Sequence, residues 1–269
     1  MCFYLAYAAA KKEAVGPKRV TPPLEPTRSF SCSLPTNLPQ SYYDISRICW
    51  MENACLPRLY YTQLDSTKCN AVAVTEQYAV TFKHGAQHSQ LAVGSSVRLH
   101  SAAQSADPFI GASDRPENIV TTQVVHVNAF ADLIILKAVG GDRFYEQDGH
   151  VMAKPLDGME YLLISINNNG LAVKHGNVIS AISNSQGQIR GTSGSDKGDS
   201  GGAVCNRAGE VIGMCIAVDK LPVQGSSDAR GPYVHQSGDR MIFCSAENIA
   251  FSLGMLGESV TLELPELEI

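Results

Sequence analysis

Short segments rich in β-branched and aromatic residues recur from about residue 71 to residue 244, and this recurrence is what most constrains the fold. The segments are bounded by Gly, Asn, Asp or Ser, the residues typical of turns. Regularly spaced short strands predict an all-β sandwich or barrel. The expected strands are 71–74, 78–82, 96–100, 119–127, 133–136, 161–166, 172–182, 202–205, 211–218, 233–235 and 241–244. Apolar residues at helical spacing over 246–256 predict one short C-terminal helix.

The composition agrees with a β-rich chain and excludes several classes of function. Of the 269 residues, 44% are hydrophobic and 23 are glycine, which suits a large core with many turns. The net charge of −5 gives no electrostatic basis for a nucleic-acid partner. No apolar run is long enough for a transmembrane helix, so we expect no membrane span in this chain. The sequence shows no metal-ligand cluster and no phosphate loop, so we expect no metal or other cofactor.

The eight cysteines are scattered and form no C-x-x-C pair. This pattern favours reduced thiols and a cytoplasmic location, with a secreted disulfide-bonded protein as the alternative.

The segment Gly198-Asp199-Ser200-Gly201-Gly202 carries the most specific chemical signal. A serine attacks a carbonyl only when a base takes its proton and preorganised donors stabilise the oxyanion. Glycines allow backbone N–H groups to approach that oxygen closely. Alone, the string also fits an ordinary turn, but the aspartate before the serine and the flanking strands favour a nucleophile at Ser200.

This segment resembles the GDSGG signature of the trypsin/chymotrypsin superfamily, and the resemblance covers roughly residues 65–256. It implies a serine endopeptidase that acts on a polypeptide substrate. It also implies two six-stranded antiparallel β-barrels, with the active site in the cleft between them. The oxyanion hole would be formed by the backbone of Gly198 and Ser200. The resemblance further implies a histidine and then an aspartate upstream of the serine.

His84 is the candidate general base. It follows Tyr78-Ala-Val-Thr-Phe-Lys, which is similar to the family's strand ending in T-A-x-H. His88 is the rival base, and His100, His126 and His150 are weaker competitors because none of them follows such a strand.

Asp132 is the candidate orienting acid. It directly precedes Leu-Ile-Ile-Leu, similar to the family's D-I-A-L-L motif, and a charge beside so apolar a strand needs a partner. The imidazole N–H of His84 would supply that partner and fix the tautomer. Asp107 and Asp114 lie beside turn residues and lack a following apolar strand.

A second serine motif, Gly191-Thr-Ser193-Gly-Ser195, resembles the nucleophile turn of flavivirus proteases. It lacks both the proline and the strand that should follow, so we interpret 189–197 as one wall of the specificity pocket. The resemblance implies substrate-binding positions at Gly194, Ser195, Cys215, Ile216, Ala217 and Val218. The acid that selects Arg or Lys in trypsins maps near Gly194, and the histidine that selects Gln in picornavirus-type proteases maps to Cys215, so neither selectivity is supported. We therefore expect a small or modestly apolar residue before the scissile bond, at P1.

Three departures from secreted trypsins define the branch. Gly85 stands where secreted members carry a cysteine directly after the histidine, and no cysteine precedes Ser200 between residues 70 and 199. No Ile-Val-Gly-Gly tetrapeptide is present, and the C-terminal half is short. Without that start, Asp199 must find a partner other than a new terminal amine. These features resemble the compact proteases of positive-strand RNA viruses, which would imply processing of the chain's own polyprotein, including cleavage in cis, in the host cytoplasm.

The sequence also fits two other interpretations of its function. One is a non-viral housekeeping trypsin-like protease. The other is a self-cleaving chymotrypsin-like capsid protein, which would need a long basic arm; residues 1–60 hold only seven basic residues and no dense run.

The expected organisation has four parts. Residues 1–64 form an N-terminal arm that is Pro-rich and either partly disordered or packed on the barrel. Residues 65–145 form the first barrel with the histidine and the aspartate. Residues 146–256 form the second barrel with the serine, the specificity pocket and the C-terminal helix. Residues 257–269, with four glutamates, form an acidic tail.

Overall fold

The computed structural model describes residues 55–64, 67–105, 119–144, 152–167, 170–219 and 239–264. All of them belong to one of the two units into which the chain divides, Gln40–Ile269, and only this unit is described below. The expected strand at 233–235 and the rival residues Asp107, Asp114 and His150 lie outside the described residues.

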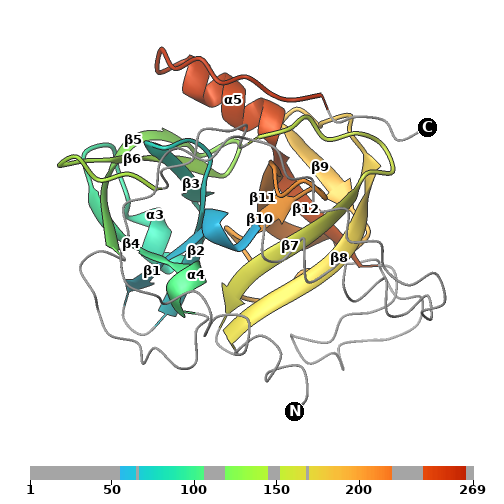
Figure 1. The fold of residues 1–269 in the computed structure, drawn as a ribbon, viewed down its shortest axis with the longest axis horizontal. Helices are drawn as coiled ribbons and strands as arrows, with labels where there is room; N and C mark the ends of the chain where they lie inside the picture. The colour runs from blue at the N-terminus through green and yellow to red at the C-terminus, as the bar shows by residue number, and fades with distance from the viewer. Residues whose placement is uncertain are drawn as a thin grey trace, which may run out of the picture. The chain divides into compact units, whose positions relative to one another are not determined.

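Two closed antiparallel β-barrels of six strands each make up the described part of the chain, which confirms the expected fold class (Figure 1). The strand order is β1-β2-β3-β6-β5-β4 in the first barrel and β10-β11-β12-β9-β8-β7 in the second. The first barrel comprises β1 (Leu59–Leu64), β2 (Thr67–Ala73), β3 (Tyr78–Phe82), β4 (Ser96–Ser101), β5 (Ile119–Asn128) and β6 (Leu133–Ala138). The second comprises β7 (Glu160–Asn167), β8 (Gly170–Ser180), β9 (Gln188–Gly191), β10 (Ala203–Cys205), β11 (Val211–Asp219) and β12 (Arg240–Ser245).

Helical segments are short. They are η1 (Leu56–Arg58), α3 (Ala86–Ser89), α4 (Ala102–Ser105) and α5 (Ala246–Gly254). The expected C-terminal helix is α5, whose first turn is capped by the Ser245 hydroxyl, which accepts the N–H of Asn248. No helix in the described ranges combines the length and the apolarity that a bilayer crossing requires.

The apolar run of β6 is explained by burial on both faces of that strand. Ile134 and Leu136 point into the core of the first barrel. Leu133 and Ile135 belong to a second cluster, which also contains Leu162 and other residues of the second barrel and of α5. Because successive side chains of a strand point to opposite faces, an uninterrupted apolar run serves two cores at once. Each fully buried Leu or Ile contributes about 1.5–3 kcal/mol.

Two strands differ from the expected organisation. The first barrel begins at β1, inside the segment 1–64 that we expected to be an arm, because Leu59, Tyr60 and Tyr61 are buried in the barrel structure. Strand β9 occupies the start of the segment that we interpreted as pocket wall, pairing with β12 through contacts such as Ile189 with Phe243. Neither strand has a run of aliphatic residues such as Leu133-Ile-Ile-Leu136 in β6.

The segment after α5 packs on the rest of the unit as far as it is described. The Tyr78 hydroxyl on β3 donates to Glu258 Oε1 at 2.6 Å. Glu263 exchanges backbone hydrogen bonds with Met152 and Lys154, in a parallel bridge to Ala153. The described part of the expected acidic tail, 257–264, therefore contacts both the first barrel and the segment that leads into the second.

Candidate active site

Asp132, His84 and Ser200 come from three separate loops and meet in one hydrogen-bonded chain. His84 Nδ1 lies 2.5 Å from Asp132 Oδ2, and His84 Nε2 lies 3.1 Å from Ser200 Oγ. The first two residues belong to the first barrel, and the serine belongs to the second. Both distances are within hydrogen-bond range, so a proton can pass from the serine to the imidazole while the carboxylate holds the other ring nitrogen.

Asp132 is held in an unusual backbone conformation. Its φ is +57°, the only positive φ of a non-glycine residue in the described ranges. The carboxylate compensates by accepting two backbone hydrogen bonds on Oδ1, from Lys83 N at 2.9 Å and His84 N at 2.7 Å. Because Oδ1 is occupied in this way, Oδ2 is directed at the imidazole. Strained conformations of this kind persist where surrounding contacts determine them, and they cluster at functional sites.

The turn that carries Ser200 depends on two glycines. Gly198 has φ +100° and Gly201 has φ +79°. A Cβ on Gly201 would lie 2.2 Å from the carbonyl oxygen of Asn70, so only glycine allows this close approach. Within the described residues, no backbone or side-chain acceptor takes the N–H of Gly198 or of Ser200. These two amides remain available to an oxyanion.

The Ser200 hydroxyl has two potential acceptors for its single proton. Besides the imidazole, it can donate to the Ile216 carbonyl oxygen at 3.0 Å. Ile216 lies on β11 of the second barrel, whereas His84 belongs to the first. The Ser200 side chain is therefore held between groups from both barrels.

The rival residues are placed away from this chain of hydrogen bonds. Ser193 is buried, and its hydroxyl lies 2.9 Å from the Tyr161 hydroxyl. His88 is 1% exposed and faces the Phe82 carbonyl through Nδ1. Burial is the main cause that lowers the pKa of His88, which favours its neutral form. His100 stacks on Tyr61.

The residues expected to bind substrate divide into buried and accessible groups. Ser195, Cys215 and Ile216 are buried, whereas Ala217 is exposed and Gly194 and Val218 are half-buried. Burial raises the pKa of the Cys215 thiol to about 12, a shift that a hydrogen bond with Ser195 opposes. The Cys215 side chain is therefore an uncharged thiol and not a thiolate nucleophile.

Strand β11 has an open edge beside Ser200. Its register with β10 begins at Ala203 opposite Met214, while its register with β12 continues to Asp219 opposite Arg240. Within the described residues, no strand pairs with the other edge of Ile216–Val218. An extended peptide can add to such an edge by main-chain hydrogen bonds.

A buried ion pair lies directly behind the serine turn, and no sequence pattern marked its cation. Asp199 is fully buried, and its Oδ2 lies 2.5 Å from Lys174 Nζ on β8. The same oxygen accepts the N–H of Asp196, and Oδ1 accepts the Ser165 hydroxyl at 2.6 Å. Burial alone would raise the pKa of Asp199, but these hydrogen bonds and the ammonium outweigh it and lower the pKa.

Asn70 on β2 is a second residue that sequence reasoning missed. Its side chain is fully buried and its Nδ2 donates to Gly198 O at 2.8 Å and to Ser200 O at 3.1 Å. Its Oδ1 accepts the N–H of Ile166 on β7. One side chain of the first barrel thus ties together two backbone segments of the second. The available signal was a lone amide at the start of the apolar run 71–74.

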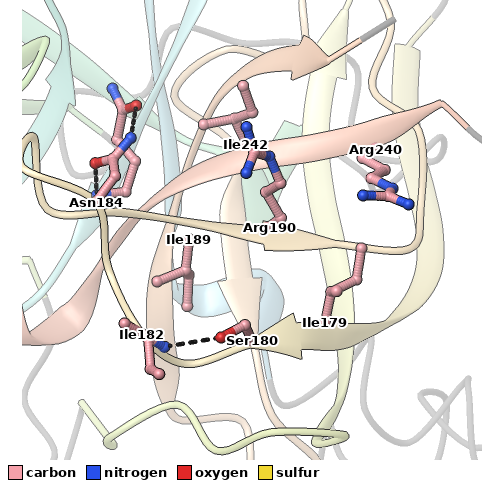
Figure 2. Close-up of a pocket in the computed structure, with 9 residues that line it drawn as sticks. Ile179, Ser180, Ile182, Asn184, Ile189, Arg190, Arg240 and Ile242 are labelled. Atoms are coloured by element: carbon pink, nitrogen blue, oxygen red, sulfur yellow. Dashed lines mark hydrogen bonds between the residues drawn. The ribbon is translucent and has the colours of Figure 1, made fainter. Parts of the chain in front are cut away.

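A separate pocket lies on the second barrel, between β8, β9 and β12 (Figure 2). Its lining combines isoleucines with two arginines, Arg190 and Arg240, and includes none of the three hydrogen-bonded residues. Among the described residues, no three His, Cys, Asp or Glu side chains form a cluster that could hold a metal ion.

The fold is a double barrel of two closed six-stranded antiparallel sheets. Solved structures that share this fold include two proteases. One is the serine endoprotease from Yersinia pestis, with 16% identity, a TM-score of 0.52, and coverage of 78% of this chain and 66% of that chain. The other is the MamO protease domain from Magnetospirillum magneticum, with 16% identity, a TM-score of 0.51, and coverage of 74% and 97%. The chain therefore spans just under two thirds of the Yersinia protein. No protein-family model and no curated protein matches the sequence.

Proposed function

We propose that this protein is a serine endopeptidase with Ser200 as nucleophile, His84 as general base and Asp132 as orienting acid. The observation that carries the proposal is the continuous hydrogen-bonded chain from Asp132 Oδ2 through both imidazole nitrogens to Ser200 Oγ. The glycine-containing turn with two available amides supports it independently.

The chemistry follows from the positions of these atoms. His84 Nε2 takes the hydroxyl proton as Ser200 Oγ attacks the scissile carbonyl carbon, and Asp132 stabilises the imidazolium. The carbonyl oxygen becomes an oxyanion that accepts hydrogen bonds from the N–H groups of Gly198 and Ser200. The imidazolium then gives its proton to the leaving amine, and the acyl-enzyme forms. Water, deprotonated by the same imidazole, releases the acid and restores Ser200.

Covalent labelling tests the nucleophile without knowledge of the substrate. When a fluorophosphonate reacts with an activated serine, Oγ forms a bond to phosphorus, the P–F bond breaks with release of fluoride, and the imidazole takes the hydroxyl proton. We expect one label per chain, located at Ser200 by peptide mass spectrometry. The variant Ser200→Ala should incorporate none, whereas Ser193→Ala, the matched control in the neighbouring serine motif, should label like the wild type. Equal labelling of Ser200→Ala and the wild type would contradict the proposal.

We further propose that the enzyme processes a viral polyprotein that contains its own sequence, in the cytoplasm of the host. The resemblance of the sequence to the compact proteases of positive-strand RNA viruses supports this role, and the five described cysteines are free thiols, as a reducing compartment keeps them. The accessible candidate positions Gly194, Ala217 and Val218 carry only small or apolar side chains, which supports a small or modestly apolar P1 residue.

One experiment tests both the role and the selectivity. A longer precursor that includes residues flanking this chain is expressed with Ser200 intact or changed to Ala. Mass spectrometry should find defined new termini only with the intact serine, each cut following a small or apolar residue. Identical termini in both precursors would overturn the processing role, and cuts after Arg, Lys or Gln would overturn the proposed selectivity.

A further inference from the structure

Asp199 lies in the sequence directly between Gly198 and Ser200, the two residues whose amides would hold the oxyanion. Its carboxylate is therefore placed to influence the conformation of both amides. The backbone of Asp199 is also fixed: its N–H donates to Asp196 O at 3.1 Å and its carbonyl accepts the N–H of Gly202 at 2.9 Å. The carboxylate also accepts the N–H of Asp196, so the side chain and the backbone of Asp199 anchor the same turn that carries the two amides.

A fully buried carboxylate is unfavourable unless a cation and hydrogen bonds compensate its charge. Asp199 has both. The cation is Lys174 on β8, whose ammonium lies 2.5 Å from Asp199 Oδ2 and 2.8 Å from Asp196 Oδ2. The lysine side chain is 20% exposed, so the ammonium reaches inward from a rigid strand to the interior of the turn. Ser165 on β7 fixes the second carboxylate oxygen.

We propose that Lys174 is a positioning residue that holds the Gly198–Ser200 turn in its catalytic conformation through the charge of Asp199. The inference rests on the proposed function, since it concerns the alignment of the same nucleophile and oxyanion amides. The cation is an internal side chain on a strand of the barrel. The turn is therefore aligned as soon as the barrel folds, and a newly generated terminal amine is not required for activity.

The test separates positioning from plain stabilisation by measuring kcat and KM apart. Lys174→Met keeps most of the side-chain stem and removes the charge. Losing one oxyanion donor costs about 10²–10³-fold in kcat, so we expect kcat to fall about 100-fold on a fluorogenic peptide that the wild type cleaves. KM should change less than threefold, because β11 and its open edge are untouched. Lys154→Met is the matched control: it breaks an ion pair with Glu247 remote from the turn and should leave kcat unchanged.

A second variant shows whether Lys174 acts through Asp199. In Lys174→Met combined with Asp199→Asn, no unpaired carboxylate is buried, and we expect kcat to recover at least fivefold over Lys174→Met alone while remaining at least tenfold below the wild type. A double variant no better than the single one would contradict the proposed route. If Lys174→Met does not fold, the double variant is compared with the wild type directly, and wild-type kcat in it would overturn the proposal.

The outcome for Lys174 is distinguishable from the outcome for the proposed function. If the wild type hydrolyses peptide and Ser200→Ala does not, the endopeptidase assignment holds whatever Lys174→Met does. Lys174→Met with kcat within threefold of the wild type would then refute only the positioning role.

The full chain carrying an N-terminal tag should be as active as the untagged chain. Activity that appears only after the tag is removed would refute an internal cation.

Discussion

Replacing Asp132 with asparagine is expected to lower kcat about 10⁴-fold while leaving the protein folded. Oδ1 of Asp132 accepts the backbone N–H groups of Lys83 and His84, and an amide oxygen can accept the same two bonds. The amide nitrogen must then face His84 Nδ1, where the carboxylate oxygen was. Because that nitrogen can only donate, Nδ1 becomes an acceptor and the ring proton moves to Nε2. A protonated Nε2 cannot take the proton of Ser200.

The measurement for Asp132→Asn combines kcat with the rate constant of fluorophosphonate labelling, which needs no knowledge of the substrate. Both should fall together, and the thermal unfolding midpoint should change little. Asp142→Asn is the matched control, because Asp142 also accepts one backbone N–H, that of Thr121, but contacts no member of the triad. Activity of Asp132→Asn within tenfold of the wild type would show that His84 does not depend on this carboxylate.

The fold was predictable wherever a strand carries a marked pattern of its own. The run Leu133-Ile-Ile-Leu136 identifies β6 because both of its faces are buried, one in each of two cores. Strand β1 was not predicted as part of the barrel because its tyrosines and polar residues do not alternate clearly, and only pairing with β2 and β4 defines it. Local patterns report burial, whereas barrel closure depends on partners distant in sequence.

The candidate site follows the same distinction. His84, Asp132 and Ser200 were predicted as a group because each lies in a local motif next to a strand, and the structure brings their side chains together. Lys174 and Asn70 were missed because neither stands in a motif, and their importance comes from contacts with residues 25 and 128 positions away along the chain. A single sequence contains no signal for such pairs, since the spacing between barrel strands fixes them only after folding.

Asn70→Asp is expected to lower kcat about 10³-fold and to destabilise the fold by about 3 kcal/mol or more. The change is isosteric, but it replaces a donor of two hydrogen bonds with an acceptor. Gly198 O and Ser200 O would then face a negatively charged oxygen instead of an N–H. Each buried acceptor that loses its partner costs about 1–3 kcal/mol, and a buried charge adds to the cost. The strain is relieved by movement of the turn, which removes the oxyanion donors.

A buried asparagine of the second barrel separates a local effect on the turn from general destabilisation. Asn206 is also buried and also makes several hydrogen bonds, to Ala208 and Glu210, but it touches neither the serine turn nor the first barrel. Asn206→Asp should lower the unfolding midpoint and leave kcat of the folded enzyme unchanged. For Asn70→Asp, both should fall, and the stability deficit should shrink in acid because the protonated carboxyl regains one donor. If Asn70→Asp lost stability but kept wild-type kcat, Asn70 would join the two barrels without aligning Ser200. The loss of both would mean that barrel packing and the geometry of the nucleophile depend on the same amide.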